Sequence, residues 1–313
     1  MITHPYRGAN LFDFFIILFK RLLTGFSGAP LATDEIQFFV LGGIAISAAL
    51  VGSLLVLRKM TMLANSLSHT ILLGLVLAVL ACGGIHLGGL LVAAVLTALS
   101  TTLLTLFLQE RARLKADASI GLVFTTLFAL AILLVTLFTR NLHLGIEAVT
   151  GNVDALTGRD ALLVGAILLF NLLFTLLFFR PYHLTSFDPG FAFAAGLSQG
   201  FFNALLMVQV GLTLVGGFRA VGVLMVLALL VGPPLAARPW VKSLKGMMVL
   251  SSLLGLLAAL LGVATARHLL SVHGLPLSTA GVTVCWIGAL TFLSWGLRRF
   301  RLDPTSDPGY SHP

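Results

Sequence analysis

The sequence predicts an all-α membrane protein in which about nine transmembrane helices pack into a single bundle. Hydrophobic residues occupy 58% of the 313 positions and charged residues only 10%, whereas roughly 25% of the residues in a soluble domain are charged. The mean hydropathy is +1.06. So few charges could not cover the surface of a water-soluble fold of this size. A soluble enzyme, a secreted disulfide scaffold and a disordered tail are therefore excluded.

Nine segments contain the roughly 17 to 25 mostly apolar residues that a helix needs to cross a bilayer. They cover residues 36–57, 66–83, 88–108, 120–139, 161–179, 201–218, 220–237, 247–266 and 279–297. The apolar stretch at residues 11–19 is too short to span, and we expect it to form a helix in the membrane interface. The predicted regions are an N-terminal interfacial segment (1–35), a transmembrane domain (36–297) and a cytoplasmic tail (298–313).

Lys and Arg residues divide unequally between the two ends of the predicted spans. Because cytoplasmic loops retain basic residues, the loop with Arg58 and Lys59 is placed on the cytoplasmic side. This assignment puts twelve of the nineteen basic residues on that side: Arg58, Lys59, Arg111, Arg113, Lys115, Arg180, Arg238, Lys242, Lys245, Arg298, Arg299 and Arg301. The prediction is an external N-terminus and a cytoplasmic C-terminus. The net charge of +8 reflects this distribution, so no nucleic-acid partner is expected.

None of the eleven Asp and Glu residues falls inside the nine spans as predicted. Carriers driven by protons or sodium commonly use an intramembrane carboxylate, so this chain is expected to take its energy from a partner. The sequence also has no Walker-type phosphate loop, no zinc-protease helix motif and no nucleophile elbow. We therefore expect no ATP hydrolysis by the chain itself and no cofactor.

One polar stretch at the start of the second predicted span could contact an ion. Asn65 and His69 are four residues apart, so on a helix they share one face, with Met62 one turn earlier. An imidazole nitrogen and an amide oxygen can form a transient, incomplete coordination shell for a divalent transition metal. The alternative is that His69 hydrogen-bonds a neighbouring helix and binds no ion, and the spacing by itself favours this alternative.

A short helix is predicted at about residues 188–196. Asp188 suits the N-cap, Pro189 the first helical position and Gly196 the position just past the end. With Phe191, the segment has a partly apolar face but is too short to span the membrane. Such a helix could dock in a groove of a soluble partner. The alternative is an ordinary surface turn.

Pro233 and Pro234 lie near the end of the seventh apolar segment. Proline removes a helix donor, so the carbonyls around Leu229 and Leu230 need another partner or a water-lined cavity. A simple kink or helix end is one interpretation of this pair. A gate is the other.

Four segments together resemble one family, the permease subunits of bacterial ATP-binding-cassette importers for zinc, manganese or iron. Residues 52–69 (GSLLVLRKMTMLANSLSH) are similar to its pattern G-x-x-x-V-x-R-x-M-S-x-x-G-D-A-L-S-H, and residues 118–124 (ASIGLVF) to A-I-G-I-V-F. Residues 186–196 (SFDPGFAFAAG) resemble S-F-D-P-E-F-A…G, and residues 220–233 (AVGVLMVLALLVGP) resemble A-V-G-x-L-L-V-x-A-L-L-x-x-P. The resemblance covers roughly residues 36–297.

The resemblance implies a multi-pass protein of the cytoplasmic membrane that works with partners. These would be a second permease subunit, identical or paralogous, two cytoplasmic ATPases and an external metal-binding protein. It assigns His69, with Asn65, to the central metal conduit and the helix at 188–196 to coupling with the ATPase. Asn65 stands where the family has an acid, and Gly190 stands where it has Glu. The neutral conduit leaves open which metal is carried and whether a non-identical permease is needed.

Two other functions remain open from the sequence. One is a permease for a metal chelate, against which the few aromatic or basic residues inside the spans argue only weakly. The other is a non-transporting assembly or sensor subunit of the membrane. A requirement for a dedicated ATPase would separate transport from the second alternative.

Overall fold

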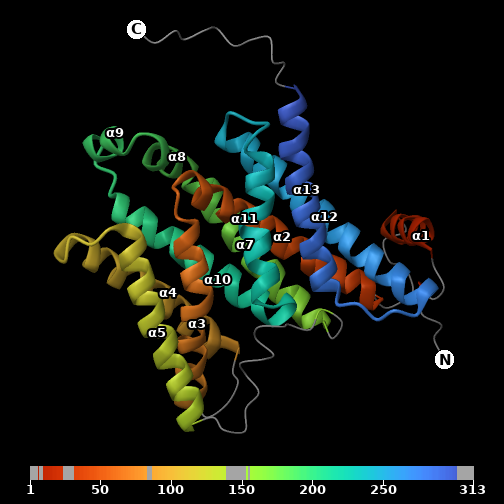
Figure 1. The fold of residues 1–313 in the computed structure, drawn as a ribbon, viewed down its shortest axis with the longest axis horizontal. Coiled ribbons are helices and arrows are strands. Elements are labelled where there is room, and N and C mark those ends of the chain that lie inside the picture. The colour runs from red at the N-terminus through yellow and green to blue at the C-terminus, as the bar shows by residue number, and fades with distance from the viewer. Residues whose placement is uncertain are drawn as a thin grey trace.

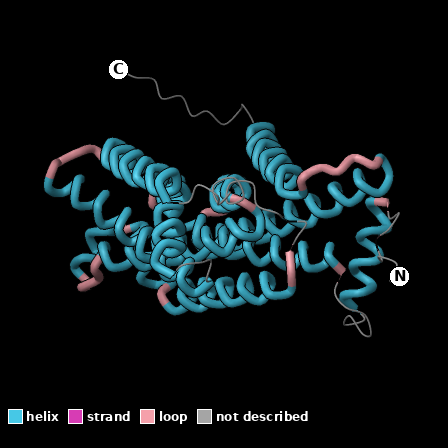
Figure 2. The backbone as a smooth tube through the Cα atoms, turned by 90° about the horizontal axis from the view of Figure 1, so that it is seen from below, coloured by secondary structure: helices cyan, strands magenta, loops and turns pink. Residues whose placement is uncertain are grey.

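The computed structural model describes Tyr6, residues 10–23, 32–82 and 87–138, Val153 and residues 156–301. All elements in these ranges are helices (Figures 1 and 2). They are α1 (Leu11–Leu23), α2 (Thr33–Leu57), α3 (Thr61–Cys82), α4 (Leu87–Arg111), α5 (Ala116–Phe138), α7 (Gly158–Leu177), α8 (Phe179–Phe187), α9 (Pro189–Ala194), α10 (Gln199–Val221), α11 (Val223–Ala237), α12 (Leu244–His273) and α13 (Thr279–Arg301). The all-α fold class is confirmed. Part of the predicted N-terminal segment, and the predicted tail beyond residue 301, lie outside these ranges.

The described residues contain eight helices long and apolar enough to cross a membrane, one fewer than the nine predicted spans. The segment predicted at 220–237 is the shorter helix α11, of 15 residues. At about 1.5 Å per residue it reaches only about 22 Å, less than the roughly 30 Å of bilayer hydrocarbon. The predicted boundary between 201–218 and 220–237 lies three residues too early, because Ala220 and Val221 belong to α10 and leave α11 shorter than predicted.

Gly222 makes the break between α10 and α11. Its φ of +83° lies in the region that favours glycine. Irregular backbone at membrane depth is tolerated only where protein covers it. Ala220, Val221 and Val223 around this glycine are all buried, so the turn is shielded from lipid.

Helix α2 is the centre of the bundle and packs against α7, α10, α11 and α12 (Figure 1). Small residues on α2 allow this close packing. At Gly52, a methyl group would overlap the backbone carbonyl of Leu230 on α11. Around this centre, α3, α4 and α5 pack on one another at one side of the bundle, and α12 and α13 pack together at the other. The outward faces of α4, α5 and α13 are largely apolar, as contact with lipid requires.

In the described ranges, acidic residues lie inside spanning helices, each in an end turn, which corrects the prediction that no carboxylate does: Asp34 and Glu35 of α2, Glu110 of α4, Asp117 of α5 and Asp160 of α7. Helix α2 begins at Thr33, so Asp34 and Glu35 occupy its first turn, and both are buried. A buried carboxylate needs a charged partner or several hydrogen bonds. The carboxylates of Asp34 and Glu35 both have such partners.

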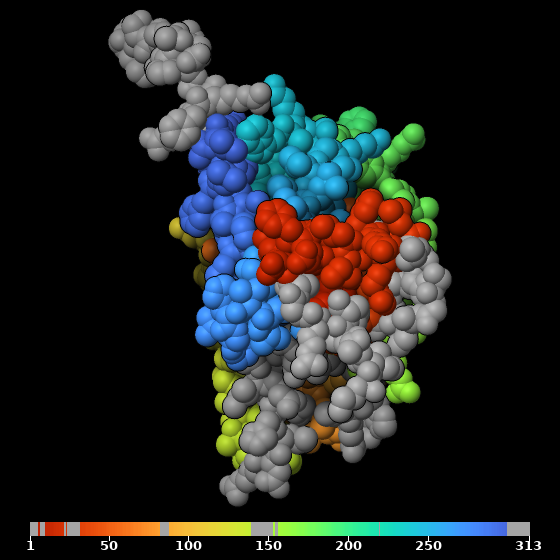
Figure 3. Space-filling model, turned by 90° about the vertical axis from the view of Figure 1, so that its right-hand side faces the viewer, coloured from red at the N-terminus to blue at the C-terminus, as the bar shows by residue number. Residues whose placement is uncertain are grey.

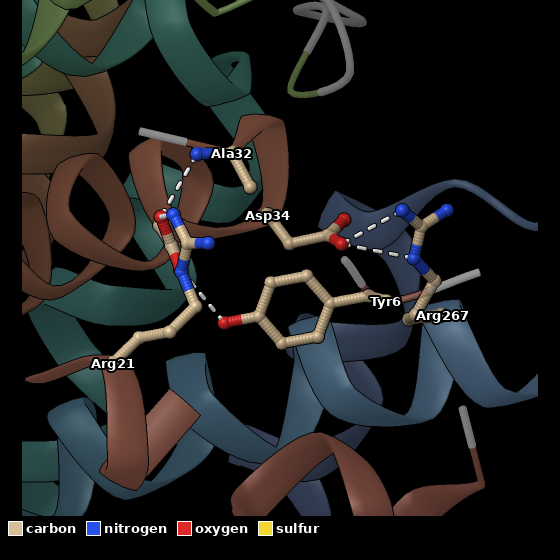
Figure 4. Close-up of polar contacts among 6 residues, drawn as sticks. Tyr6, Arg21, Ala32, Asp34 and Arg267 are labelled. Carbon is tan, nitrogen blue, oxygen red and sulfur yellow. Dashed lines mark hydrogen bonds and ion pairs between the residues drawn. The ribbon is translucent and has the colours of Figure 1, made fainter. Parts of the chain in front are cut away.

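The partners of these two acids fasten the N-terminal part of the chain to the bundle (Figure 4). The Tyr6 hydroxyl donates to Glu35 Oε1 at 3.0 Å, and Arg21 forms an ion pair with the same carboxylate. Arg267 of α12 lies 2.8 Å from Asp34 Oδ2. Burial, and then the adjacent Glu35 charge, raise the pKa of Tyr6. The Tyr6 hydroxyl therefore stays protonated and able to donate at neutral pH.

Helix α1 lies on the surface and packs against α12 (Figure 3). Phe14 and Leu18 of α1 are buried. An opposite stripe is exposed and consists of Phe12, Ile16, Phe19 and Leu23. At 13 residues α1 is too short to span.

Candidate coupling and conduit sites

The segment at 188–196 contains the short helix α9. The side chain of Asp188 accepts a hydrogen bond from the backbone N–H of Phe191 at 2.9 Å, and Pro189 is the first helical residue. The helix ends at Ala194, and Gly196 follows with φ +78°. Each local feature therefore does what its residue type favours at a helix end.

Helix α9 projects from one end of the bundle and buries little of itself (Figure 1). Ala192 is its one buried residue among those described. Three aromatic side chains at and beside it are exposed: Phe187, Phe191 and Phe193, the last by 83%. Clustered exposed aromatic residues outside a membrane span are a surface that a protein partner could cover.

Helix α8, directly before α9, was missed by the sequence analysis, which ended the preceding span at residue 179 and continued as a loop. The structure ends α7 at Leu177 and begins a second helix at Phe179. Pro181 in its first turn is the signal that could have predicted it, because proline is tolerated there. Burial raises the pKa of the neighbouring Tyr182, so its phenol stays neutral.

Asn65 and His69 both lie on α3, as expected, but in different surroundings. Asn65 is exposed, whereas His69 is half-buried. The imidazole ring lies between Phe124 and Phe128 of α5, with centroid distances of 5.4 and 5.5 Å. Within the described parts of the chain it forms no hydrogen bond to a neighbouring helix, so nothing there occupies its nitrogen lone pair.

The structure does not bring a complete metal-binding cluster together in the described ranges. No group of three or more His, Cys, Asp or Glu side chains there could hold an ion. Asn65 and His69 can together supply two ligands, which is fewer than a resident transition-metal site uses. This arrangement is chemically suited to passing contact with an ion.

Pro233 and Pro234 lie inside α11, which continues through both to Ala237. The prolines free the carbonyls of Leu229 and Leu230, and Gly52 allows α2 to lie directly against the second of these. Side chains of α13 bond to three carbonyls in the last turns of α11: Thr291 to Gly232, Ser294 to Ala236 and Trp295 to Leu235. Contacts with α2 and α13 therefore support the backbone around the two prolines.

These features define a class of protein: a polytopic helical membrane protein that presents a short capped helix at one end of its bundle. The model of the ABC 3 transport family matches residues 35–295. The chain belongs to the ABC 3 transport family. The resemblance drawn from the four sequence motifs is thereby confirmed.

Several curated proteins are similar over most of their length. A probable metal transport system membrane protein of Chlamydia muridarum is 42% identical over 285 residues, which cover 90% of each chain. The manganese transport system membrane protein MntD of Bacillus subtilis is 34% identical, over 80% of this chain and 88% of that one. The zinc transport system membrane protein TroD of Treponema pallidum is 32% identical, over 76% of this chain and 69% of that one.

The fold also matches solved structures. PsaBC from Streptococcus pneumoniae, in complex with Fab, has a TM-score of 0.74 at 23% identity and covers 90% of this chain and 95% of that one. A putative metal-chelate type ABC transporter in an inward-facing conformation has a TM-score of 0.60 at 16% identity. The match covers 93% of this chain and 99% of that one. At these identities the matches establish the shared fold.

Proposed function

We propose that this chain is the membrane permease subunit of an ATP-binding-cassette importer for manganese or zinc ions. Membership of the ABC 3 transport family supports the transport class. Two of the three relatives described above carry manganese or zinc in their names, and none of the three names iron. The proposal therefore narrows the three metals expected from sequence to two.

The observation that carries this proposal is α9, a capped helix that projects from the bundle with exposed aromatic side chains. A permease without a nucleotide site must receive its driving force through a contact of this kind. Docking of α9, through Asp188, Pro189, Phe191 and Gly196, in a groove of a cytoplasmic ATPase would transmit the closure of the ATPase to the helices.

The metal would pass along α3. His69 offers an imidazole without a hydrogen bond in the described structure, and Asn65 offers an exposed amide on the same helix. With only these two ligands, the ion would be held weakly and released. Pro233 and Pro234 on α11 would serve as a flexible point beside the conduit, because their missing N–H groups leave fewer bonds to break there.

The partners follow from this mechanism. A cytoplasmic ATPase would hydrolyse ATP, a second permease subunit, identical or paralogous, would complete the pore, and an external metal-binding protein would deliver the ion. The chain would lie in the bacterial inner membrane with its N-terminus outside. Helix α1, with its exposed apolar stripe, would lie in the outer interface of that membrane.

The test is reconstitution in lipid vesicles with radioactive manganese or zinc. We expect accumulation of metal only when the chain is combined with its partner ATPase, the metal-binding protein and ATP. Vesicles that contain the chain alone should accumulate no metal against a gradient. Accumulation by the chain alone would overturn the proposal, and so would a complete assembly that hydrolyses ATP without moving either metal.

A further inference from the structure

Arg58 caps the end of α2 and holds residues on both sides of α9. Its Nε donates to Ser186 Oγ at 2.9 Å and its Nη2 to Thr185 Oγ1 at 2.6 Å, both in the last turn of α8. Its Nη1 donates to Asn203 Oδ1 at 2.5 Å, in the first turns of α10. One side chain therefore joins the central helix to the segment that precedes α9 and the segment that follows it.

The two hydroxyl groups are oriented to accept these bonds. Thr185 donates its own proton to the carbonyl of Pro181 at 2.8 Å, and Ser186 donates to the carbonyl of Tyr182 at 2.6 Å. Each hydroxyl oxygen thus keeps its lone pairs for the guanidinium. The three acceptors are neutral and point at three different nitrogens, an arrangement that suits the planar guanidinium and that a single ammonium group cannot reproduce.

Tyr182 connects Arg58 to further hydrogen bonds inside the bundle. Its ring lies 5.4 Å from the guanidinium carbon of Arg58, close enough for a cation–π contact. Its hydroxyl donates to Gln209 Oε1 on α10 at 2.7 Å. Gln209 in turn donates to the backbone carbonyl of Asn171 and to Thr175 on α7. Buried hydrogen bonds of this kind are costly to break, since each group would lose its partner away from water.

We propose that Arg58 is the positioning residue that fixes α9 to the central helix, so that a displacement of α9 moves α2. The inference rests on the proposed function, because it takes α9 as the docking element. It assigns no contact with the metal or with ATP to Arg58. Without the guanidinium, α8 and the start of α10 lose their common anchor, and α9 can move without moving the bundle.

Charge at position 58 is part of this role. Burial lowers the pKa of Arg58 to about 10, and Tyr182 acts in the opposite direction. Arginine therefore stays protonated at neutral pH. A lysine at this position would lose its proton at a lower pH than arginine, because its ordinary pKa of about 10.4 is lower and the same burial would lower it further. A lysine variant would therefore lose its charge, and with it the contact, as the pH rises.

The experiment compares Arg58→Gln and Arg58→Lys with the native chain in the reconstituted transporter. The control is Lys59→Asn, which removes one positive charge from the neighbouring exposed residue. Asparagine is tolerated at its φ of +57°. We expect Arg58→Gln to lower metal imported per ATP hydrolysed by about tenfold or more, a change of about 1.4 kcal/mol in coupling. Lys59→Asn should leave this ratio unchanged.

Two further measurements separate positioning from loss of fold. Hydrogen exchange should accelerate over residues 179–203 in Arg58→Gln and stay native in α12 and α13. At pH 7 the ratio of transport to hydrolysis in Arg58→Lys should lie between those of the native chain and Arg58→Gln, because lysine keeps the charge but not the three-way contact. The ratio should fall further as the pH is raised, while that of the native chain changes little. Faster exchange throughout the bundle, or native coupling in Arg58→Gln, would overturn the inference.

The proposed function can fail separately. If variants of α9 itself, such as Asp188→Lys, couple normally, α9 is not the docking element and the proposed function loses its support. If those variants lose coupling while Arg58→Gln keeps it, only the role of Arg58 is refuted.

Discussion

Two properties of His69 bear on its proposed place in the conduit. It is half-buried between two phenylalanine rings of α5, yet in the described structure its imidazole forms no hydrogen bond. Polar side chains inside a membrane are costly and mark functional positions. The rings fix the orientation of the imidazole without competing for its lone pair.

We expect His69→Ala to abolish uptake of manganese and zinc while the protein stays in the membrane. Alanine has no side-chain atom that can coordinate an ion, so the variant removes the ligand between Phe124 and Phe128. The measurement is uptake of radioactive metal, with the amount of protein in the membrane determined in parallel. His273→Ala, on the exposed last turn of α12, is the matched control. Normal uptake by His69→Ala would remove this residue from the conduit.

Single residues also show what sequence reasoning can and cannot reach. The N-cap role of Asp188 was predictable because the side chain bonds to a backbone group three residues away. The role of Arg58 was not, because its three hydrogen-bond partners are 127 to 145 residues away in the chain. Nothing local in residues 52–69 indicates which groups the guanidinium will contact.

At the scale of elements, α9 depends on its two ends. It has only six residues, too few for a stable helix by propensity alone. The cap at Asp188 is worth about 0.5–2 kcal/mol, and Gly196 allows the chain to leave the helix at positive φ. Its shape is therefore sensitive to substitutions at both positions.

We expect Asp188→Lys and Gly196→Val each to abolish stimulation of the partner ATPase by the permease. Lysine removes the cap and places a positive charge at the positive end of the helix, and valine is strained at φ +78°. Asp188→Ser and Gly196→Asn are the controls, since serine still caps and asparagine tolerates this backbone conformation. The readout is ATP hydrolysis with and without the permease. Full stimulation in both disruptive variants would contradict docking through α9.

Among the elements, α8 and α11 show where apolar patterning was insufficient. The apolar composition predicted two segments here, 201–218 and 220–237, but the break between α10 and α11 lies at Gly222, three residues beyond the predicted boundary. Likewise α8 directly follows α7 with a single residue between them. Hydrophobic runs locate helices in the membrane, whereas their ends depend on backbone conformation and on neighbouring helices.

For the whole molecule, the distribution of basic residues predicts which end faces the cytoplasm. The end of the bundle that carries α9 also carries Arg58, Lys59 and Arg180, together with the turns at 111–115 and 238–245. Among the described residues, the opposite end holds fewer basic residues, and two of these, Arg21 and Arg267, are neutralised by Glu35 and Asp34. The ion pairs therefore increase the difference in charge between the two ends.

Labelling of single cysteines tests this orientation in cells. In a chain with both native cysteines replaced by serine, a cysteine at Leu275 should react with a membrane-impermeant maleimide added outside. A cysteine that replaces Phe193 should react with the same maleimide only after the membrane is permeabilised. Both side chains are exposed, so access to the reagent decides the result. The reverse pattern would invert the orientation and place α9 away from any cytoplasmic ATPase.

The sequence alone determined the all-α class, most of the spans and the caps of α9. It also identified the family, through four motifs in order. These properties depend on composition, on the apolar length of a segment and on bonds between residues three or four apart. Each of these properties depends on residues that are close to one another in the sequence.

Only the tertiary structure decided which groups meet. It placed Asp34 and Glu35 inside α2 beside Arg267 and Arg21, brought α2 against the carbonyl of Leu230 at Gly52, and joined Arg58 to both flanks of α9. Such contacts form between segments far apart in sequence. They are set by how whole helices pack, because a side chain finds its distant partner only after the helices that carry both have assembled.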